Sequence, residues 1–304
     1  MFIYRERDNL IYRIHPLTSI FYIFTIALLS LVFSHPVFLL ALFLALGMVI
    51  VSAEITREWV TCLKFSLSFI LIIMVVNCLF VRAGTTVLLV GPVMPGIGKI
   101  RITLEALCYG AGMGLRFFVI ISAFCLYTHA VHPDKVLKLL GKWGNKTVLA
   151  LSLATRLFPL MTSDFQRIME VQRCRGVNFQ ENHWQKKLKK LVPVINIMLL
   201  SSLERSFQLA ESMQARGYGL GKRSHYTEEL WHPRDILIIT FVAIGIIMGT
   251  WLVFAGWTSY RYYPRLQPVD LQEIVMAGFL SIFFIFPACL NWGWKKWPLL
   301  KSRI

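Results

Sequence analysis

The residues best suited to chemistry in this sequence are two arginines that occupy the same place in a repeated pattern. Arg175 lies near the end of the segment EVQRCRG (170–176), and Arg216 lies near the end of the segment ESMQARG (211–217). A guanidinium group is a rigid fork of donors that suits carboxylates and backbone carbonyls, and lysine does not replace it at equal strength. One E-x-x-x-x-R-G match is weak evidence, but two copies in one chain predict binding to two similar partners.

The same pattern also has a purely structural explanation. An arginine followed by glycine is a good helix end, because a cation is favoured in the last turn and glycine readily adopts the left-handed conformation at C′. Each motif follows a long helical-looking stretch. We therefore expect Arg175 and Arg216 at helix ends whether or not they bind a partner.

The composition places these motifs in a membrane protein. The chain has 304 residues, is 56% hydrophobic and has a mean hydropathy of +0.60, which is too apolar for a soluble domain. Its net charge is +16. In a soluble protein this charge would favour nucleic-acid binding, but in a membrane protein the positive-inside rule explains it, and we expect no nucleic-acid partner.

Six apolar segments approach the ~20 residues that a membrane-spanning helix needs. They are 17–34, 37–53, 65–82, 104–128, 236–257 and 271–292. Between the third and fourth of these segments, residues 83–101 are rich in glycine and proline, which predicts a loop outside the bilayer. The predicted fold class is an all-α integral membrane protein with about six transmembrane helices plus a cytoplasmic helical coupling region.

The distribution of basic residues predicts the orientation. With both termini in the cytoplasm, few of the 32 Lys+Arg fall on the outer side. Those few are Arg82, Lys99, Arg101, Arg261 and Arg265. This topology divides the chain into N-terminal helices 1–4 (1–128), a cytoplasmic region (129–235), and helices 5 and 6 with a basic tail (236–304).

The cytoplasmic region carries both arginine motifs. Its pattern predicts helices at about 133–143, 147–174 and 186–215. These helices are too apolar to stand alone in water, so we expect them to lie against the membrane, each other or partners.

Catalytic and metal-binding signatures are weak. The six cysteines are scattered without C-x-x-C spacing, and no phosphate-binding loop or hydrolase motif occurs, so we expect no metal site, no cofactor and no catalytic residue in this chain. His129 and His132 are one turn apart, which leaves a metal pair conceivable, although histidines at the end of a span explain them more simply.

Arg116 lies inside the fourth span, where a cation is costly and often marks a functional polar site. Alternatively, Arg116 is a shallow arginine that reaches outward or pairs with Glu105.

The motifs in this order resemble the transmembrane T component of energy-coupling factor (ECF) transporters, a family that includes cobalt-transport permeases. The resemblance covers about 15–235. It rests on HPLTS (15–19), LSLATRLFPL (151–160) and the two arginine motifs, which are similar to the family's paired Ala-Arg-Gly motifs. The residues that the resemblance assigns to ATPase coupling are Cys174, Arg175, Gly176, Ala215, Arg216 and Gly217, with Glu170, Glu211, Arg156 and Pro159 as supporting residues.

The resemblance implies a non-catalytic subunit of an ATP-driven importer in a bacterial or archaeal cell membrane. Such a subunit holds one substrate-binding S component in the bilayer and rests on two ABC ATPase subunits, which bind the ATP. The arginine ends would insert into grooves on the ATPases, and the helices would transmit closure to the S component for uptake of a vitamin or transition-metal ion.

Two features depart from the family pattern. Cys174 stands where the family usually has alanine, but both residues are small, so we expect little loss. The last span (271–292) is an addition, and we expect removal of 266–304 to leave ATPase assembly largely intact.

Two alternatives belong to other classes of function. A stand-alone carrier or permease would work without ATPases, but it should show polar or broken spans at the membrane midplane. An intramembrane enzyme would use His129, His132 or Asp134 at the bilayer edge, but no paired catalytic motif supports it.

Overall fold

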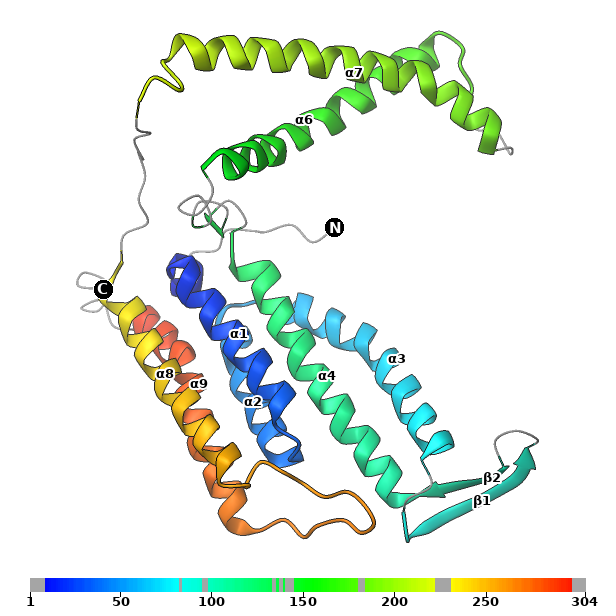
Figure 1. Ribbon diagram of the computed structural model, residues 1–304, viewed down its shortest axis with the longest axis vertical. Helices are drawn as coiled ribbons and strands as arrows, with labels where there is room; N and C mark the ends of the chain where they lie inside the picture. Colours follow the sequence, from blue (N-terminus) through cyan, green and yellow to red (C-terminus); the bar gives the residue numbers. More distant parts are fainter. Residues whose placement is uncertain are drawn as a thin grey trace. The chain divides into compact units, whose positions relative to one another are not determined.

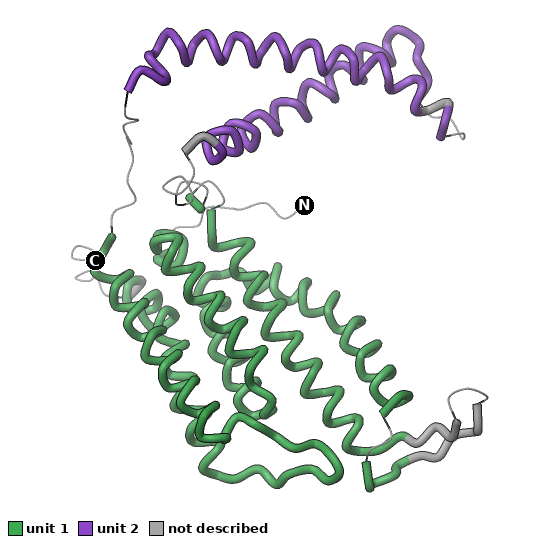
Figure 2. Tube along the Cα trace, viewed as in Figure 1, with its two compact units in different colours: residues 1–136, 230–304 green, residues 137–229 purple. Residues whose placement is uncertain are grey.

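The chain forms two compact units. The computed structural model describes residues 9–81, 84–94, 98–132, 135–136, 139, 145–179, 184–221 and 231–296. One unit comprises residues 1–136 and 230–304, and is called the membrane unit here; the other comprises residues 137–229, and is called the hairpin unit (Figure 2). The sequence-based boundaries at 129 and 235 lie within eight residues of these limits.

The membrane unit is a helical bundle with a short β-hairpin (Figure 1). Its elements are the 3-10 turn η1 (Leu10–Arg13), α1 (Pro16–Val32), α2 (Pro36–Ser52), α3 (Thr56–Phe80), β1 (Val87–Met94), β2 (Gly98–Thr103), α4 (Leu104–Ala130), α8 (Pro233–Phe254) and α9 (Leu271–Lys296). Each of the six predicted spans corresponds to one of these helices, which confirms the all-α membrane fold class.

Helices α1 and α2 match the predicted lengths closely, whereas α3 is longer than predicted. Helices α1 and α2 have 17 residues each, so each is about 26 Å long and slightly short of the ~30 Å hydrocarbon core. Helix α3 begins nine residues earlier than expected, because its polar first turns, with Glu58 near the positive helix start, still favour helix.

A His-Pro dipeptide starts both short helices. The Nδ1 atoms of His15 and His35 accept hydrogen bonds from the backbone N–H of Leu17 (3.2 Å) and Val37 (3.3 Å). Proline follows each histidine at the first helical position, where its missing N–H has no cost. The same His-Pro cap therefore determines where both α1 and α2 begin.

The core of the membrane unit forms where α1, α2, α4, α8 and α9 pack together. Its largest fully buried side chains include Phe33, Phe38 and Phe284. Glycines let neighbouring helices approach closely: a Cβ on Gly114 of α4 would lie 2.6 Å from Ile70 Cγ2 of α3. Close approach through glycine is typical of helices packed in membranes.

Helix α9 is an integral part of this core. It runs parallel to α2 and is tied to it at both ends. Near the start of α2, the His35 Nε2 lies 3.1 Å from the Glu273 carboxylate; at its end, the Asn291 side-chain amide donates to the Ser52 carbonyl at 2.6 Å. The paired residues are 238 positions apart in the first contact and 239 in the second, so α2 and α9 stay in register along the whole of α2.

The segment predicted as a loop at 83–101 instead contains a β-hairpin. Strands β1 and β2 pair antiparallel from Val87 opposite Thr103 to Met94 opposite Gly98. The register shifts between Val90 and Val93, where Gly91 and Pro92 lie. Proline is tolerated in a sheet at a bulge or a free edge, so the Gly/Pro content that predicted a loop is compatible with this strand.

The hairpin unit contains two long helices, α6 (Asn145–Cys174) and α7 (Trp184–Ala215), close to the predicted 147–174 and 186–215. The helix predicted at 133–143 lies mostly outside the described residues. Within the part of the chain that the structure describes, Thr147–Cys174 also meets the length and composition of a membrane span, although we predicted a non-spanning helix there. Among the five described helices that meet these criteria, it has the lowest mean hydropathy. No residue in its most apolar 18-residue stretch, called its apolar window here, is buried.

Candidate functional site

The first arginine-glycine pair ends α6 in a defined backbone motif. The Gly176 N–H donates to the Arg173 carbonyl at 2.9 Å, and the Val177 N–H donates to the Gln172 carbonyl at 3.1 Å. Gly176 has φ +86°. These two bonds with a left-handed glycine define a Schellman motif.

The second pair ends α7 with the same motif. The Gly217 N–H donates to the Gln214 carbonyl at 2.9 Å, and the Tyr218 N–H donates to the Met213 carbonyl at 3.0 Å. Gly217 has φ +75°. The sequence repeat is therefore also a structural repeat, and each arginine occupies the C-cap position between the last helical residue and the left-handed glycine.

The side chains at both ends are available to a partner. Cys174, Arg175, Ala215 and Arg216 are all exposed. In the part of the chain that the structure describes, neither guanidinium group has a hydrogen-bond or ion-pair partner. A small residue before each arginine leaves its backbone and stem open to approach. Each end can therefore present an unpaired cation on a rigid helix terminus, a suitable anchor for a carboxylate or for carbonyl groups.

The four supporting residues form no hydrogen bond or ion pair with the two arginines in the described structure. Glu170, Glu211, Arg156 and Pro159 are exposed, and among the described residues no bond joins either glutamate to an arginine of the motifs. Pro159 lies inside α6, which continues through it. The structure places the six motif residues at two separate helix ends. The roles of the four supporting residues remain predictions.

Sequence reasoning missed an ion pair between the two helices. The Arg205 Nη2 lies 2.7 Å from the Asp164 Oδ2, with side chains 30% and 27% exposed. The opposite charges are visible in the sequence, but nothing in a single sequence pairs residues that are 41 apart on different helices.

One end of the membrane unit is closed by the N-terminal segment. Leu10, Ile11 and Tyr12 are buried there. The Leu10 N–H donates to the Asn291 Oδ1 of α9 at 3.1 Å, and the His15 N–H donates to the Asp235 Oδ1 of α8 at 3.0 Å. Backbone bonds to two helices thus hold this segment across the end of the bundle.

The other end is closed by the turn between α1 and α2. The Ser34 and His35 N–H groups both donate to the Thr258 carbonyl, at 3.1 and 3.0 Å, and the Tyr262 hydroxyl donates to the Ser34 carbonyl at 3.2 Å. Burial raises the pKa of Tyr262 to about 12, so its hydroxyl remains a donor. Burial also lowers the pKa of His35, although Glu273 opposes this shift.

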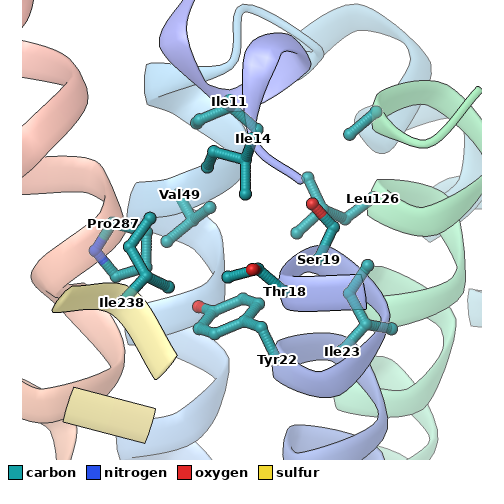
Figure 3. A pocket seen from close by; sticks show the side chains of 11 residues that line it. Ile11, Ile14, Thr18, Ser19, Tyr22, Ile23, Val49, Leu126, Ile238 and Pro287 are labelled. Atoms are coloured by element: carbon teal, nitrogen blue, oxygen red, sulfur yellow. The ribbon is translucent and has the colours of Figure 1, made fainter. Parts of the chain in front are cut away.

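A small cavity lies inside the bundle near the N-terminal segment. Its volume is about 30 Å³, enough for one or two water molecules. Side chains from the N-terminal segment, α1, α2 and α4 converge on it, with Ile238 of α8 and Pro287 of α9 (Figure 3). The Thr18 hydroxyl is buried at this cavity with no hydrogen-bond partner in the described structure. A cavity of this size cannot hold a vitamin.

A much larger groove lies on the outside of the same unit, between α2 and α9. It encloses about 1010 Å³ and is lined mainly by apolar side chains, including Phe43, Met48 and Phe286. Trp59 forms part of its wall and stacks obliquely on Phe43 with ring centroids 5.7 Å apart.

Arg116 contributes to the second closed end rather than to a path through the bundle. Its Nη2 donates to the Phe33 carbonyl at 2.8 Å. The alternative pairing of Arg116 with Glu105 is not seen in the described structure, where the Glu105 Oε1 accepts hydrogen bonds from Thr85 and from the Thr86 N–H. The role of Arg116 as an intramembrane polar site stays a prediction.

The histidines considered for metal binding do not form a site in the described structure. Among the described residues, no group of three or more His, Cys, Asp or Glu side chains is placed to hold a metal ion. The His129 Nδ1 lies 2.9 Å from the Cys125 carbonyl in its own helix. Asp134, the third residue of the enzyme alternative, lies outside the described residues.

Together these features define a class: a multi-pass, all-α membrane protein with a separate pair of long helices whose ends display matched arginines. Residues 7–227 match the CbiQ family, described as "Cobalt transport protein". Because the match covers more than half of the chain, the protein belongs to this family of transport proteins. The last two helices, α8 and α9, lie beyond the matched region.

Curated relatives carry a consistent description. The chain is 36% identical over 170 residues to "Energy-coupling factor transporter transmembrane protein EcfT" of Streptococcus thermophilus, and the alignment covers 52% of this chain and 64% of that protein. The protein of the same description from Listeria innocua is 28% identical over 194 residues, which cover 60% and 71% of the two chains. That from Bacillus selenitireducens is 25% identical over 265 residues, which cover 83% and 93%. The alignment thus spans somewhat less than two thirds of the Streptococcus protein.

Proposed function

We propose that this protein is the transmembrane coupling subunit of an ECF-type importer. In this role, two ABC ATPase subunits bind and hydrolyse ATP, and the hairpin unit transmits their closure to a membrane-embedded S component that carries a vitamin or transition-metal ion. The observation that carries the proposal is the structural repeat at the ends of α6 and α7. The two ends match, and their arginines are exposed and have no partner among the described residues, so they suit two matching partner subunits.

The orientation belongs to the same proposal. Both termini and the hairpin unit face the cytoplasm of a bacterial or archaeal cell, where ATP is available. The bias of Lys+Arg toward that side supports this placement. The residues at the two ends, Arg175 and Arg216 above all, bind the ATPases, and this chain itself binds no ATP.

The membrane unit favours coupling over independent transport. Its two ends are closed by hydrogen-bonded backbone, its described internal cavity of about 30 Å³ is far smaller than a vitamin, and its larger groove of about 1010 Å³ lies on the outside of the bundle. A carrier that works alone needs a substrate site near the midplane between its helices. The closed bundle is better suited to hold a separate S component in the membrane.

Co-purification in detergent tests the proposal. Candidate ABC ATPases, tagged and co-expressed, are expected to capture the wild-type chain and to lose the Arg175→Glu/Arg216→Glu variant, because each reversal places a carboxylate where the partner accepts a cation. Arg173→Glu is the matched control, since it reverses an exposed charge two residues from Arg175 and should keep capture. Equal capture of wild type and double variant would reduce the arginines to helix ends, and capture of neither would return the chain to the class of independent carriers.

A further inference from the structure

The hairpin unit joins its two helices at two separate places. The first is the turn that follows α6. There Phe179 is 7% exposed, Val194 of α7 is fully buried, and the Lys190 Nζ donates to the Asn178 carbonyl at 2.8 Å. This contact, called the turn contact here, attaches the end of α6 to the first half of α7.

The second place is the Asp164–Arg205 ion pair, with an N–O distance of 2.7 Å. Asp164 lies ten residues before the end of α6, which corresponds to about 15 Å along the helix. Arg205 lies 15 residues after Lys190, or about 22 Å along α7. The ion pair is therefore well separated from the turn contact on both helices.

Apolar packing between the two helices is shallow, with side chains such as Met161, Ile168 and Met198 only half-buried. None of the residues in the apolar window of α6 is buried, and α7 exposes large side chains such as Leu199, Leu200 and Phe207. Two helices that bury a shared apolar face have their crossing angle set by that packing. Packing this shallow constrains the angle between α6 and α7 only weakly, so we expect the points of attachment to restrict it further.

Two points of attachment fix this angle, whereas one leaves it free. If the ion pair is broken, α7 can rotate about the turn contact. Arg216 lies 26 residues beyond Lys190, so it is about 39 Å from that contact, and a rotation of only ~10° displaces it by roughly 7 Å. Such a displacement is larger than the precision that a bidentate arginine contact requires.

We infer that Asp164 and Arg205 are positioning residues that set the angle between α6 and α7, and with it the placement of Arg216 relative to Arg175. Partly exposed ion pairs contribute little to overall stability and are sensitive to salt, so this pair can open without unfolding the unit. For its consequence on ATPase binding, this inference rests on the proposed function. The effect on the angle itself stands independently of that function.

Distance measurements between spin labels test the inference. All six native cysteines are replaced, and labels are attached at Ala154→Cys on α6 and Gln208→Cys on α7, both exposed and both beyond the ion pair. In lipid nanodiscs at low salt, the otherwise unmodified chain is expected to give one narrow distance distribution. Asp164→Asn and Arg205→Gln should each broaden it by roughly twofold or more, because a second population of angles becomes accessible.

Two controls separate the ion pair from a general loss of structure. The swapped variant Asp164→Arg/Arg205→Asp should restore the narrow distribution, since the opposite charges still face each other. Arg167→Gln, which neutralises an exposed charge one turn from Asp164, should leave the distribution unchanged. Raising the salt to about 1 M, where the Debye length is ~3 Å, should broaden the distribution of the unmodified chain but not that of Asp164→Asn.

Narrow distributions in both single variants would overturn the inference, as would a swapped variant as broad as the single ones. ATPase capture by the same variants keeps the two proposals distinguishable. If the coupling role fails, Arg175→Glu/Arg216→Glu keeps wild-type capture while the distance result still stands. If the positioning role fails, the distances are unchanged while capture still depends on the arginines.

Discussion

Gly114 in the membrane unit and Gly176 in the hairpin unit are both required, but for different physical reasons. A Cβ at Gly114 would lie 2.6 Å from Ile70, so this glycine is needed for space between packed helices. A Cβ at Gly176 would meet nothing within 4 Å, but its φ of +86° is strained for other residues. The first glycine serves packing within the chain, and the second serves the shape of an exposed end.

The same contrast extends to the polar residues of the two units. In the membrane unit, Asn291, Asp235 and Arg116 bond to backbone groups and close the bundle. In the hairpin unit, Arg175 and Arg216 have no partner among the described residues. A bundle whose polar side chains tie its helices and connecting segments together is suited to act as a stable frame, whereas helices with exposed ends and exposed apolar faces are suited to bind other chains.

The largest effect is expected from removing α9, which tests whether α9 is part of the stable bundle of the membrane unit. Removing residues 266–304 takes away Phe284, Leu280 and both ties to α2, so we now expect loss of a monodisperse, folded protein rather than the intact assembly expected from sequence. Size-exclusion chromatography in detergent measures this outcome. A shorter truncation of residues 298–304 is the control and should behave as wild type. ATPase capture at wild-type level by the longer truncation would show that α9 is dispensable.

A smaller effect is expected from the two glycines. Gly114→Ala overpacks the contact with Ile70, which typically costs ~1–3 kcal/mol, and should lower the midpoint of thermal unfolding by several degrees. Gly176→Ala should leave that midpoint unchanged within error and weaken ATPase capture, because it strains only the end of α6. Gly176→Asn should recover capture, since asparagine tolerates the left-handed conformation. Equal thermal shifts for both alanine variants would contradict the comparison.

The smallest expected effect is a pH dependence of the stability of the membrane unit. Burial lowers the pKa of His35 in the fold, so the unfolded state binds more protons once the pH falls below ~6.5, the usual value for histidine. Stability contributed by neutral His35 is therefore complete above that pH and is lost as the pH falls toward the folded pKa. The unfolding midpoint of wild type should decrease between pH 7.5 and 5.5, and His35→Gln should show a shallower decrease. Parallel pH curves for the two proteins would argue against this role of His35.

Local and periodic features of the fold were predictable from the sequence. Apolar runs located all six helices of the bundle, and the Arg-Gly pairs located the ends of α6 and α7. The β-hairpin was missed because Gly91 and Pro92 disfavour strand unless a bulge accommodates them. The capping role of His15 and His35 has a visible signal in the sequence, the repeated His-Pro dipeptide.

Tertiary relations were not predictable from one sequence. The contacts of Asn291 with Leu10 and Ser52 join residues 281 and 239 positions apart, and no local pattern announces them. For the same reason, neither the Asp164–Arg205 pair nor the ties of α9 to α2 could be predicted from the sequence. The candidate site was more accessible to sequence reasoning, because an exposed helix end depends on local chemistry alone.

The proposal depends most on one claim, that the ABC ATPases bind at the two arginine ends of the hairpin unit. Single cysteines at Cys174 and Ala215→Cys, in a background without other cysteines, allow maleimide labelling beside each arginine, and Thr162→Cys provides an exposed control on α6. When ABC ATPases are added, labelling should slow strongly at both ends and remain unchanged at Thr162→Cys. Unchanged labelling at both ends of a chain that still binds the ATPases would place the interface elsewhere and contradict the account.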